Sequence, residues 1–145
     1  MHPYPHHYAA SAHGGPTASV EVNSAGLPPI HTSPPPQFDG PEGVWSPETL
    51  LCAAIADCFI LTFRGVARAA RFEWQALECE VEGILERADG VSRFTRFVTH
   101  AVLTVPATAD VEKAKALLER AEHSCLVSNS VNGARVLQVD VKCGG

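Results

Sequence analysis

The chain has 145 residues, of which 46% are hydrophobic and 19% charged, a balance typical of one soluble globular domain. Its formal net charge is −5, with 11 Lys and Arg against 16 Asp and Glu, which argues against a nucleic-acid interface because such an interface needs a concentrated basic patch. The five cysteines are an odd number and contain no CxxC pair, so we expect neither a disulfide framework nor a zinc site.

The N-terminal third predicts short strands and loops. Residues 1–8 are rich in His and Pro and predict a flexible tail, which explains their histidines better than a metal site does. A first short strand is expected before Gly14, and residues 17–24 alternate between apolar and polar side chains, as in a half-buried strand. Residues 26–45 carry many prolines and glycines and predict an extended loop with a brief edge strand near 30–32.

A long apolar helix is predicted for residues 46–71. Ser46 can accept a hydrogen bond from the free N–H groups of the first turn, and Glu48 faces the positive end of the helix dipole. The apolar residues that follow leave almost no polar face, so we expect burial on nearly all sides. Only Asp57 and Thr62 interrupt this apolar sequence, and the carboxylate of Asp57 beside the thiol of Cys58 marks a candidate site.

The second half of the chain alternates between strand and helix patterns. The expected elements are a strand, a returning strand, an amphipathic helix and a last strand, at residues 75–82, 92–105, 111–122 and 134–141. Asp89 and Gly90 predict the tight hairpin turn between the first two. Short strands, a buried helix, a hairpin, a helix and a strand together predict an α+β fold in a single domain, 1–145.

We expect a cytoplasmic protein. Residues 1–10 lack a basic segment followed by an apolar one, as a signal peptide would have. The longest apolar stretch, about residues 50–63, is shorter than the roughly 20 residues that cross a bilayer.

Two cysteine motifs resemble those of the OsmC/Ohr family, the osmotically inducible and organic hydroperoxide resistance proteins. The first runs from Ser46 and Glu48 to Cys58, and the second is the segment around Cys125 that ends at Asn129. The resemblance covers nearly the whole chain. It implies antiparallel sheets wrapped around a long buried central helix, an intertwined homodimer, and a thiol peroxidase that needs no bound cofactor and is reduced by an external, dihydrolipoyl-type dithiol.

The resemblance also implies roles for individual residues. Cys58 matches the peroxidatic cysteine of the family, Cys125 the resolving cysteine, and Glu48 the active-site glutamate. The family's N-terminal arginine has no counterpart, because Pro16 follows the two glycines and Arg64 is the first basic residue of the chain apart from histidines.

The thiolate chemistry needs a cation or hydrogen-bond donor near Cys58, because burial alone raises the pKa of a thiol. We consider His13 as the substitute for the arginine, with four other candidates in Arg64, Arg68, Arg93 and Arg96. Glu48 precedes Cys58 by ten residues, roughly 15 Å along one straight helix, so it would act on the cysteine of a partner subunit. The simpler role for Glu48 is to stabilise the helix dipole.

The resemblance implies reduction of organic, lipophilic hydroperoxides through a Cys58 sulfenate and a Cys58–Cys125 disulfide. We expect Leu51, Ile55 and Phe59, together with the Pro-rich loop, to line the apolar site. An alternative is a non-catalytic binding protein that holds a small lipophilic ligand in the same place, and a cysteine hydrolase built on Cys58 is a third. Cys52 and Cys79 are expected in the core, and Cys143 on the surface.

Overall fold

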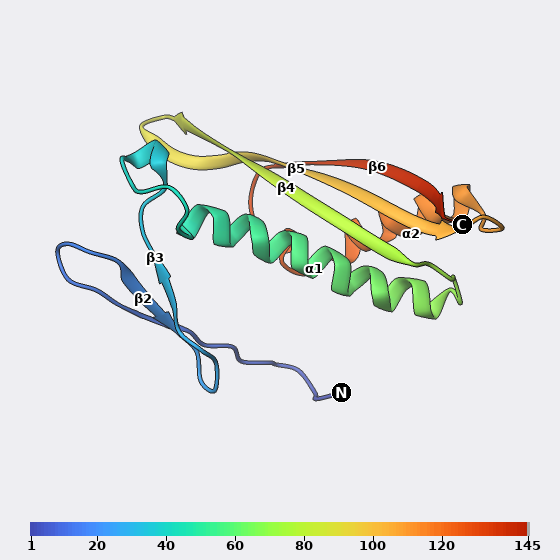
Figure 1. Cartoon of the computed structure of the whole chain (residues 1–145), viewed down its shortest axis with the longest axis horizontal. Coiled ribbons are helices and arrows are strands. Elements are labelled where there is room, and N and C mark those ends of the chain that lie inside the picture. Colours follow the sequence, from blue (N-terminus) through green and yellow to red (C-terminus); the bar gives the residue numbers. More distant parts are fainter. Residues whose placement is uncertain (145) are drawn as a thin grey trace. The chain divides into compact units, whose positions relative to one another are not determined.

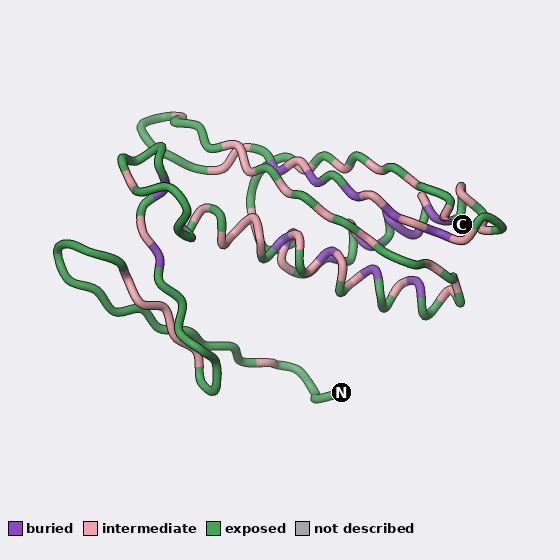
Figure 2. Tube along the Cα trace, in the orientation of Figure 1, coloured by how far each residue is buried: buried purple, intermediate pink, exposed green. Residues whose placement is uncertain are grey.

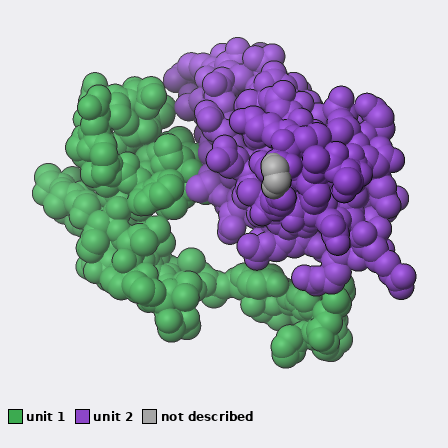
Figure 3. Space-filling model, turned by 45° about the vertical axis from the view of Figure 1, so that its right-hand side comes forward, with its two compact units in different colours: residues 1–50 green, residues 51–145 purple. Residues whose placement is uncertain are grey.

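We describe residues 1–144 of a computed structural model of the chain (Figure 1). It contains two α-helices and six strands, with two short 3-10 helices in the connections. The chain divides after residue 50 into two compact units, which Figure 3 shows in different colours. The prediction of a single domain therefore stays a prediction, and each unit is described by itself below.

The first unit, Met1–Leu50, contains a small antiparallel sheet in the order β1-β2-β3. Its strands are Ser11–His13, Val20–Asn23 and Ile30–Thr32. The alternating segment at 17–24 forms β2 only from Val20 onward, because Ala18 has a left-handed backbone with φ of 69° that ends the extended conformation. The brief edge strand expected near 30–32 is confirmed.

Helix α1, Pro47–Ala69, begins at the predicted residues. The Ser46 hydroxyl accepts from the Thr49 backbone N–H at 3.1 Å, and the Thr49 hydroxyl accepts from the Ser46 N–H at 3.0 Å. This reciprocal pair satisfies two backbone donors that have no partner within the helix, as in a capping box. Proline at the first helical position has no N–H to leave unpaired.

The second unit, Leu51–Gly145, has a three-stranded sheet in the order β4-β5-β6. The strands are Ala76–Ala88, Val91–Pro106 and Ala134–Gly144. The hairpin turn at Asp89 and Gly90 is confirmed, with φ of 54° and 76°, the left-handed values that a tight hairpin requires. Helix α2, Val111–Ser124, connects β5 to β6, and its start is capped by the Asp110 side chain, which accepts from the Lys113 N–H at 3.1 Å.

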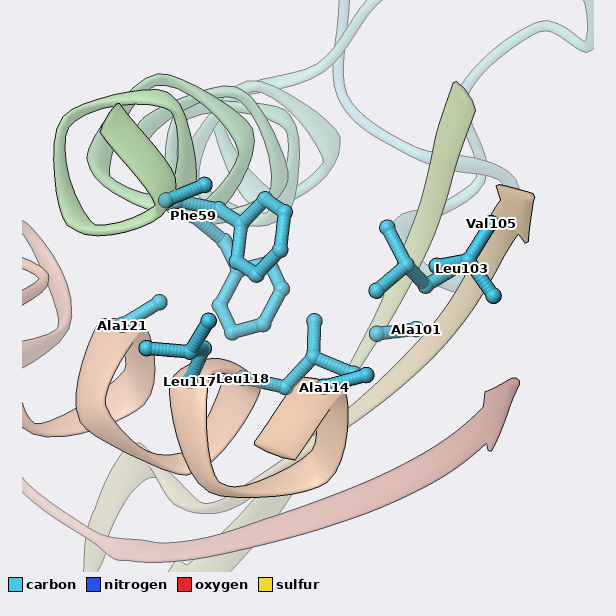
Figure 4. Packing of buried hydrophobic residues seen from close by; sticks show 10 residues of the cluster. Phe59, Ala101, Leu103, Val105, Ala114, Leu117, Leu118 and Ala121 are labelled. Carbon is cyan, nitrogen blue, oxygen red and sulfur yellow. The ribbon is translucent and has the colours of Figure 1, made fainter. Parts of the chain in front are cut away.

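The core of this unit lies between one face of the sheet and the two helices. Figure 4 shows Phe59 of α1 and Leu118 of α2 approaching Leu103 of β5. Side chains from all three elements are completely buried: Phe59, Phe63, Ala67, Ala101, Leu103, Val105, Ala114, Leu118 and Ala121. Helical spacing on α2 and alternation on β5 place these residues on the faces that meet, as the sequence predicts.

Two features of the expected architecture differ in the structure. The larger sheet is mixed, because β6 pairs in parallel with β5, whereas antiparallel sheets are expected. The reason is α2, a helical crossover that returns the chain to the same end of the sheet. Burial of α1 on nearly all sides is also wrong for the single chain, where one stripe is buried, at Ile55, Phe59, Phe63 and Ala67 (Figure 2).

The stripe follows from helix geometry, because residues four apart share one face of a helix and only one face of α1 meets the core. With 23 residues, α1 is longer than the predicted apolar stretch, and its length and composition alone would allow it to cross a membrane. Core helices of soluble proteins meet the same criterion. Outside this stripe the apolar residues of α1 are partly buried or exposed, and Leu61 is 51% exposed.

Candidate functional site

Cys58 lies on α1 at the wall of an apolar hollow. The hollow has a volume of about 490 Å³ and lies between one face of α1 and the turn that follows α2. Its lining residues are Ala54, Asp57, Cys58, Leu61, Thr62, Leu126 and Val127. Positions 54, 58, 61 and 62 share a helix face because they are three or four residues apart. The thiol is half-buried and open to a small molecule in this hollow.

Four neutral groups surround the Cys58 sulfur. Burial raises the pKa of this thiol, but hydrogen bonds from Val127 N–H, the Cys125 thiol, the Thr62 hydroxyl and Leu126 N–H together hold the pKa below its usual value. The Thr62 oxygen is 3.8 Å from the sulfur, one helical turn further along α1. Donors of this kind stabilise a thiolate more than the neutral thiol, which favours Cys58 over Cys125 as the nucleophile.

Cys125 is the first residue after α2 and is completely buried. Burial raises its pKa, and the neighbouring Cys58 raises it further, whereas hydrogen bonds from the Ser128 side chain and backbone act in the opposite direction. Cys125 is therefore the more weakly acidic partner, and its thiol acts as a donor that lowers the pKa of Cys58. The pair is asymmetric, with a half-buried thiol of lowered pKa beside a completely buried thiol of raised pKa.

This arrangement supports thiol redox chemistry. An electrophile that enters the hollow meets the Cys58 sulfur first, and any oxidised sulfur formed there has the Cys125 thiol as a neighbour. Such a neighbour can condense with a sulfenic acid to give a disulfide and water.

The other three cysteines differ from this pair. Burial, with smaller effects from Glu122 and Cys125, raises the pKa of Cys79 to about 12. Burial also raises the pKa of Cys52, although the Gly83 N–H donates to it. Cys143 is exposed, as expected. A thiol with a pKa near 12 is almost fully protonated at neutral pH, so Cys79 has little nucleophilic character.

The two other predicted site residues belong to the first unit. Glu48 is in the first turn of α1, and its Oε1 is buried with no hydrogen-bond partner among residues 1–144. His13 is exposed on β1, opposite Glu21 of β2. The structure thus brings together Cys58 and Cys125, while the roles of Glu48 and His13 stay predictions.

The expected lining of the site from α1 is wrong, because none of Leu51, Ile55 and Phe59 borders the hollow. Ile55 and Phe59 are 1% and 0% exposed and point into the core, so they do not line the hollow. Their neighbours Ala54 and Leu61 provide the apolar surface of α1 instead. The physical reason is the 100° rotation between successive helical residues, which turns the buried stripe of Ile55 and Phe59 about a quarter of a turn away from the stripe centred on Cys58.

Sequence reasoning also missed several donors. Thr62 is four residues after Cys58, a spacing that places both on one face and could have identified it. Ser128, three residues after Cys125, is 4% exposed, and a serine this near a buried thiol was a usable signal. The backbone N–H groups of Leu126 and Val127 have no side-chain signature, because almost every residue carries one.

A mixed sheet packed against two helices, with one cysteine on α1 and a second directly after α2, defines an α+β protein with a candidate two-cysteine site. The chain belongs to the OsmC-like protein family, whose model matches residues 40–140. It is 31% identical over 116 residues to the uncharacterized protein YmaD of Bacillus subtilis strain 168, an alignment covering 77% of each chain. The recognition of an OsmC/Ohr member from the two cysteine motifs is thereby confirmed.

Solved structures agree on the fold. An OsmC-like protein of unknown function from Vibrio cholerae has a TM-score of 0.85 at 18% identity, covering 94% of this chain and 100% of its own. An organic hydroperoxide resistance protein OsmC from Legionella pneumophila has a TM-score of 0.76 at 26% identity, covering 97% and 99%. The organic hydroperoxide resistance protein OhrB of Bacillus subtilis has a TM-score of 0.66 at 22% identity, covering 94% and 98%.

Proposed function

We propose that this protein is a thiol peroxidase that reduces organic hydroperoxides to alcohols. The observation that carries the proposal is the hydrogen-bonded pair of Cys58 and Cys125 at an apolar hollow, with the pKa of the more exposed thiol lowered and that of the buried one raised. The names of related structures, organic hydroperoxide resistance proteins, support the same substrate class.

The proposed cycle has three balanced steps. The Cys58 thiolate attacks one peroxide oxygen, the O–O bond breaks, and the departing alkoxide takes a proton, which leaves Cys58 sulfenic acid and an alcohol. The Cys125 thiol then attacks the sulfenic sulfur, so that a Cys58–Cys125 disulfide forms and water leaves. An external dithiol, for which we propose a dihydrolipoyl group, reduces the disulfide and is itself oxidised.

The hollow favours a lipophilic substrate. Ala54, Leu61, Leu126 and Val127 provide apolar walls, and Leu126 is 68% exposed before a substrate covers it. Each Å² of apolar surface removed from water stabilises binding by about 25 cal/mol, so an alkyl chain adds affinity that hydrogen peroxide lacks. Lipid-derived hydroperoxides fit this description.

We further propose that the active form is a cytoplasmic homodimer. The apolar composition of α1 and the exposure of Leu61 on it support a second copy as its partner, since exposed apolar surface commonly marks an interface. The unpartnered buried oxygen of Glu48 supports the view that a group outside the single chain completes its surroundings. Glu48 would then serve the Cys58 of the partner, and His13 is the proposed cation in place of the arginine.

Thiol counting tests the proposal. Reduced protein mixed with cumene hydroperoxide should lose two free thiols. Cys125→Ser should accumulate a sulfenic acid at Cys58 that dimedone traps. Cys58→Ser should lose no free thiol. Cys143→Ser, which removes an exposed cysteine, is the matched control and should behave like the wild type. Oxidation of Cys58 no faster than that of free cysteine would refute the peroxidase.

A second candidate function is a non-catalytic protein that holds a small lipophilic ligand in the hollow. The specific observation in its favour is Pro16, which stands where related sequences are expected to carry an arginine. It predicts that cumene hydroperoxide or its alcohol binds without loss of thiols, so the same mixture distinguishes the two candidates.

A further inference from the structure

Arg135, near the start of β6, makes hydrogen bonds that have no role in the proposed cycle. Its Nε donates to Glu122 Oε1 at 2.8 Å, its Nη1 donates to Asn129 Oδ1 at 2.7 Å, and its Nη2 donates to the Glu122 backbone carbonyl. Glu122 is in the last turn of α2, and Asn129 is in the short 3-10 helix Ser128–Ser130 that follows Cys125. One guanidinium therefore holds both ends of the segment that carries Cys125.

The segment needs such partners because α2 ends there. The last carbonyls of a helix have no partner within it. Arg135 donates to the carbonyl of Glu122, and Asn129 Nδ2 donates to the carbonyl of His123 at 3.0 Å. The Asn129 backbone N–H also bonds to the Cys125 carbonyl at 2.9 Å. The end of α2 and the turn after it are thus fixed by one connected set of bonds.

This set of bonds is partly shielded from water. The Arg135 and Glu122 side chains are only 26% and 13% exposed. Arginine suits the position because its planar guanidinium presents several donors in fixed directions, so that three acceptors can be held at once. A lysine offers a single point of charge and reproduces at most part of the arrangement.

The turn that Arg135 holds supplies the donors of the reactive thiol. The N–H groups of Leu126 and Val127 and the Cys125 thiol all bond to the Cys58 sulfur, and all belong to the segment between Glu122 and Asn129. Leu126 is largely exposed, so side-chain packing does little to hold the turn at that point. A loss of the bonds at its two ends would therefore change the direction of the donors.

We propose that Arg135 is a positioning residue for the redox site: it bonds to Glu122 and Asn129 and thereby aims the turn's donors at the Cys58 sulfur. It touches neither a substrate nor a reacting sulfur and acts through the turn alone. The inference deepens the proposed function, since it identifies a group that prepares the nucleophile without an N-terminal arginine.

The test is the pH profile of Cys58 alkylation by iodoacetamide, measured at this residue by peptide mass spectrometry in the full-length protein. The other titratable side chains at the hollow are Asp57 and Cys125, which none of the variants changes. Arg135→Ala should move the midpoint to higher pH and slow alkylation about tenfold at pH 7, while the rate at high pH is retained. Arg135→Lys should recover part of the loss.

Two further variants test the role of Arg135 while leaving its ion pair with Glu122 in place. Asn129→Ala leaves the Arg135–Glu122 ion pair in place, so it avoids an unpaired buried carboxylate and should fold while shifting the midpoint in the same direction. Arg120→Ala removes an exposed arginine of α2 and should match the wild type.

An unchanged midpoint in folded Asn129→Ala and Arg135→Lys would overturn the inference. An equal loss of rate at every pH would overturn it as well, because it would indicate altered access rather than altered thiolate stability. Alkylation requires no peroxide, so a protein that resists cumene hydroperoxide yet shows the shifted midpoint would refute the peroxidase and leave the role of Arg135 standing.

Discussion

Thr62→Val removes one donor of the reactive thiol with little change in shape. The hydroxyl is 3.8 Å from the Cys58 sulfur and is replaced by a methyl group of similar size. A hydrogen bond to a charged group contributes about 1.5–3 kcal/mol, and the lower end applies here because the distance is long and the sulfur is half-exposed. Alkylation of Cys58 at pH 7 should therefore slow by up to about tenfold, since 1.4 kcal/mol corresponds to roughly one pKa unit.

The direction in which the pKa of Cys58 changes depends on which form of the thiol the Thr62 hydroxyl stabilises. The hydroxyl stabilises the thiolate and so contributes to the lowered pKa of Cys58, and its loss raises that pKa. Less thiolate is then present below the midpoint, whereas at high pH both proteins are fully ionised. The more basic thiolate of the variant is also intrinsically more nucleophilic, so the two profiles should approach or cross at high pH.

The assay is the rate of iodoacetamide labelling of Cys58 between pH 5 and 10, resolved by peptide mass spectrometry. Thr108→Val, in the exposed connection between β5 and α2, is the control and should leave the profile unchanged. Coincident profiles for Thr62→Val and wild type would show that the hydroxyl does not stabilise the thiolate, and the assignment of donors at the site would be wrong.

Three other substitutions have distinct expected effects. Ser128→Ala removes a donor that lowers the pKa of Cys125, so stopped-flow trapping should show normal formation of the sulfenic acid and slower formation of the disulfide; slowing of the first step would contradict this. Gly83→Ala should destabilise the fold by about 1–3 kcal/mol in urea unfolding, because its Cβ would lie 2.9 Å from the Cys52 sulfur, and an unchanged midpoint would mean that the contact relaxes freely. Leu118→Ala, at a completely buried site, should cost about 2–5 kcal/mol, and a loss below 1 kcal/mol would contradict tight packing there.

The sequence allowed the local elements to be predicted well. Ser46 and Asp110 mark helix starts by capping, and Asp89 with Gly90 marks the hairpin, because these features depend on residues close together in the chain. The direction of β6 was not predictable in this way. Alternation identifies the faces of a strand but is the same for parallel and antiparallel pairing, so the mixed sheet became apparent only from the arrangement of α2.

The candidate site was predictable in part. The family motifs identified Cys58 and Cys125, and the structure places the two thiols close enough for each to shift the pKa of the other. The lining was mispredicted because α1 is apolar on most faces, so its sequence did not distinguish the stripe of Ile55 and Phe59 from the face that carries Cys58. The contacts of Arg135 could not be predicted from the sequence, because its partners are up to 13 residues away and lie on other elements.

The complete burial of Cys125 determines where regeneration can begin. In the proposed disulfide, only the Cys58 sulfur is open to an incoming reductant, so the mixed disulfide must form at Cys58 and Cys125 must be the leaving group. A thiol with a raised pKa leaves slowly, and the Ser128 hydroxyl partly offsets this by stabilising the departing thiolate. Reduction of the disulfide would thus always begin at Cys58 and release Cys125. Its rate would depend on Ser128, a residue that takes no part in the reaction with the peroxide.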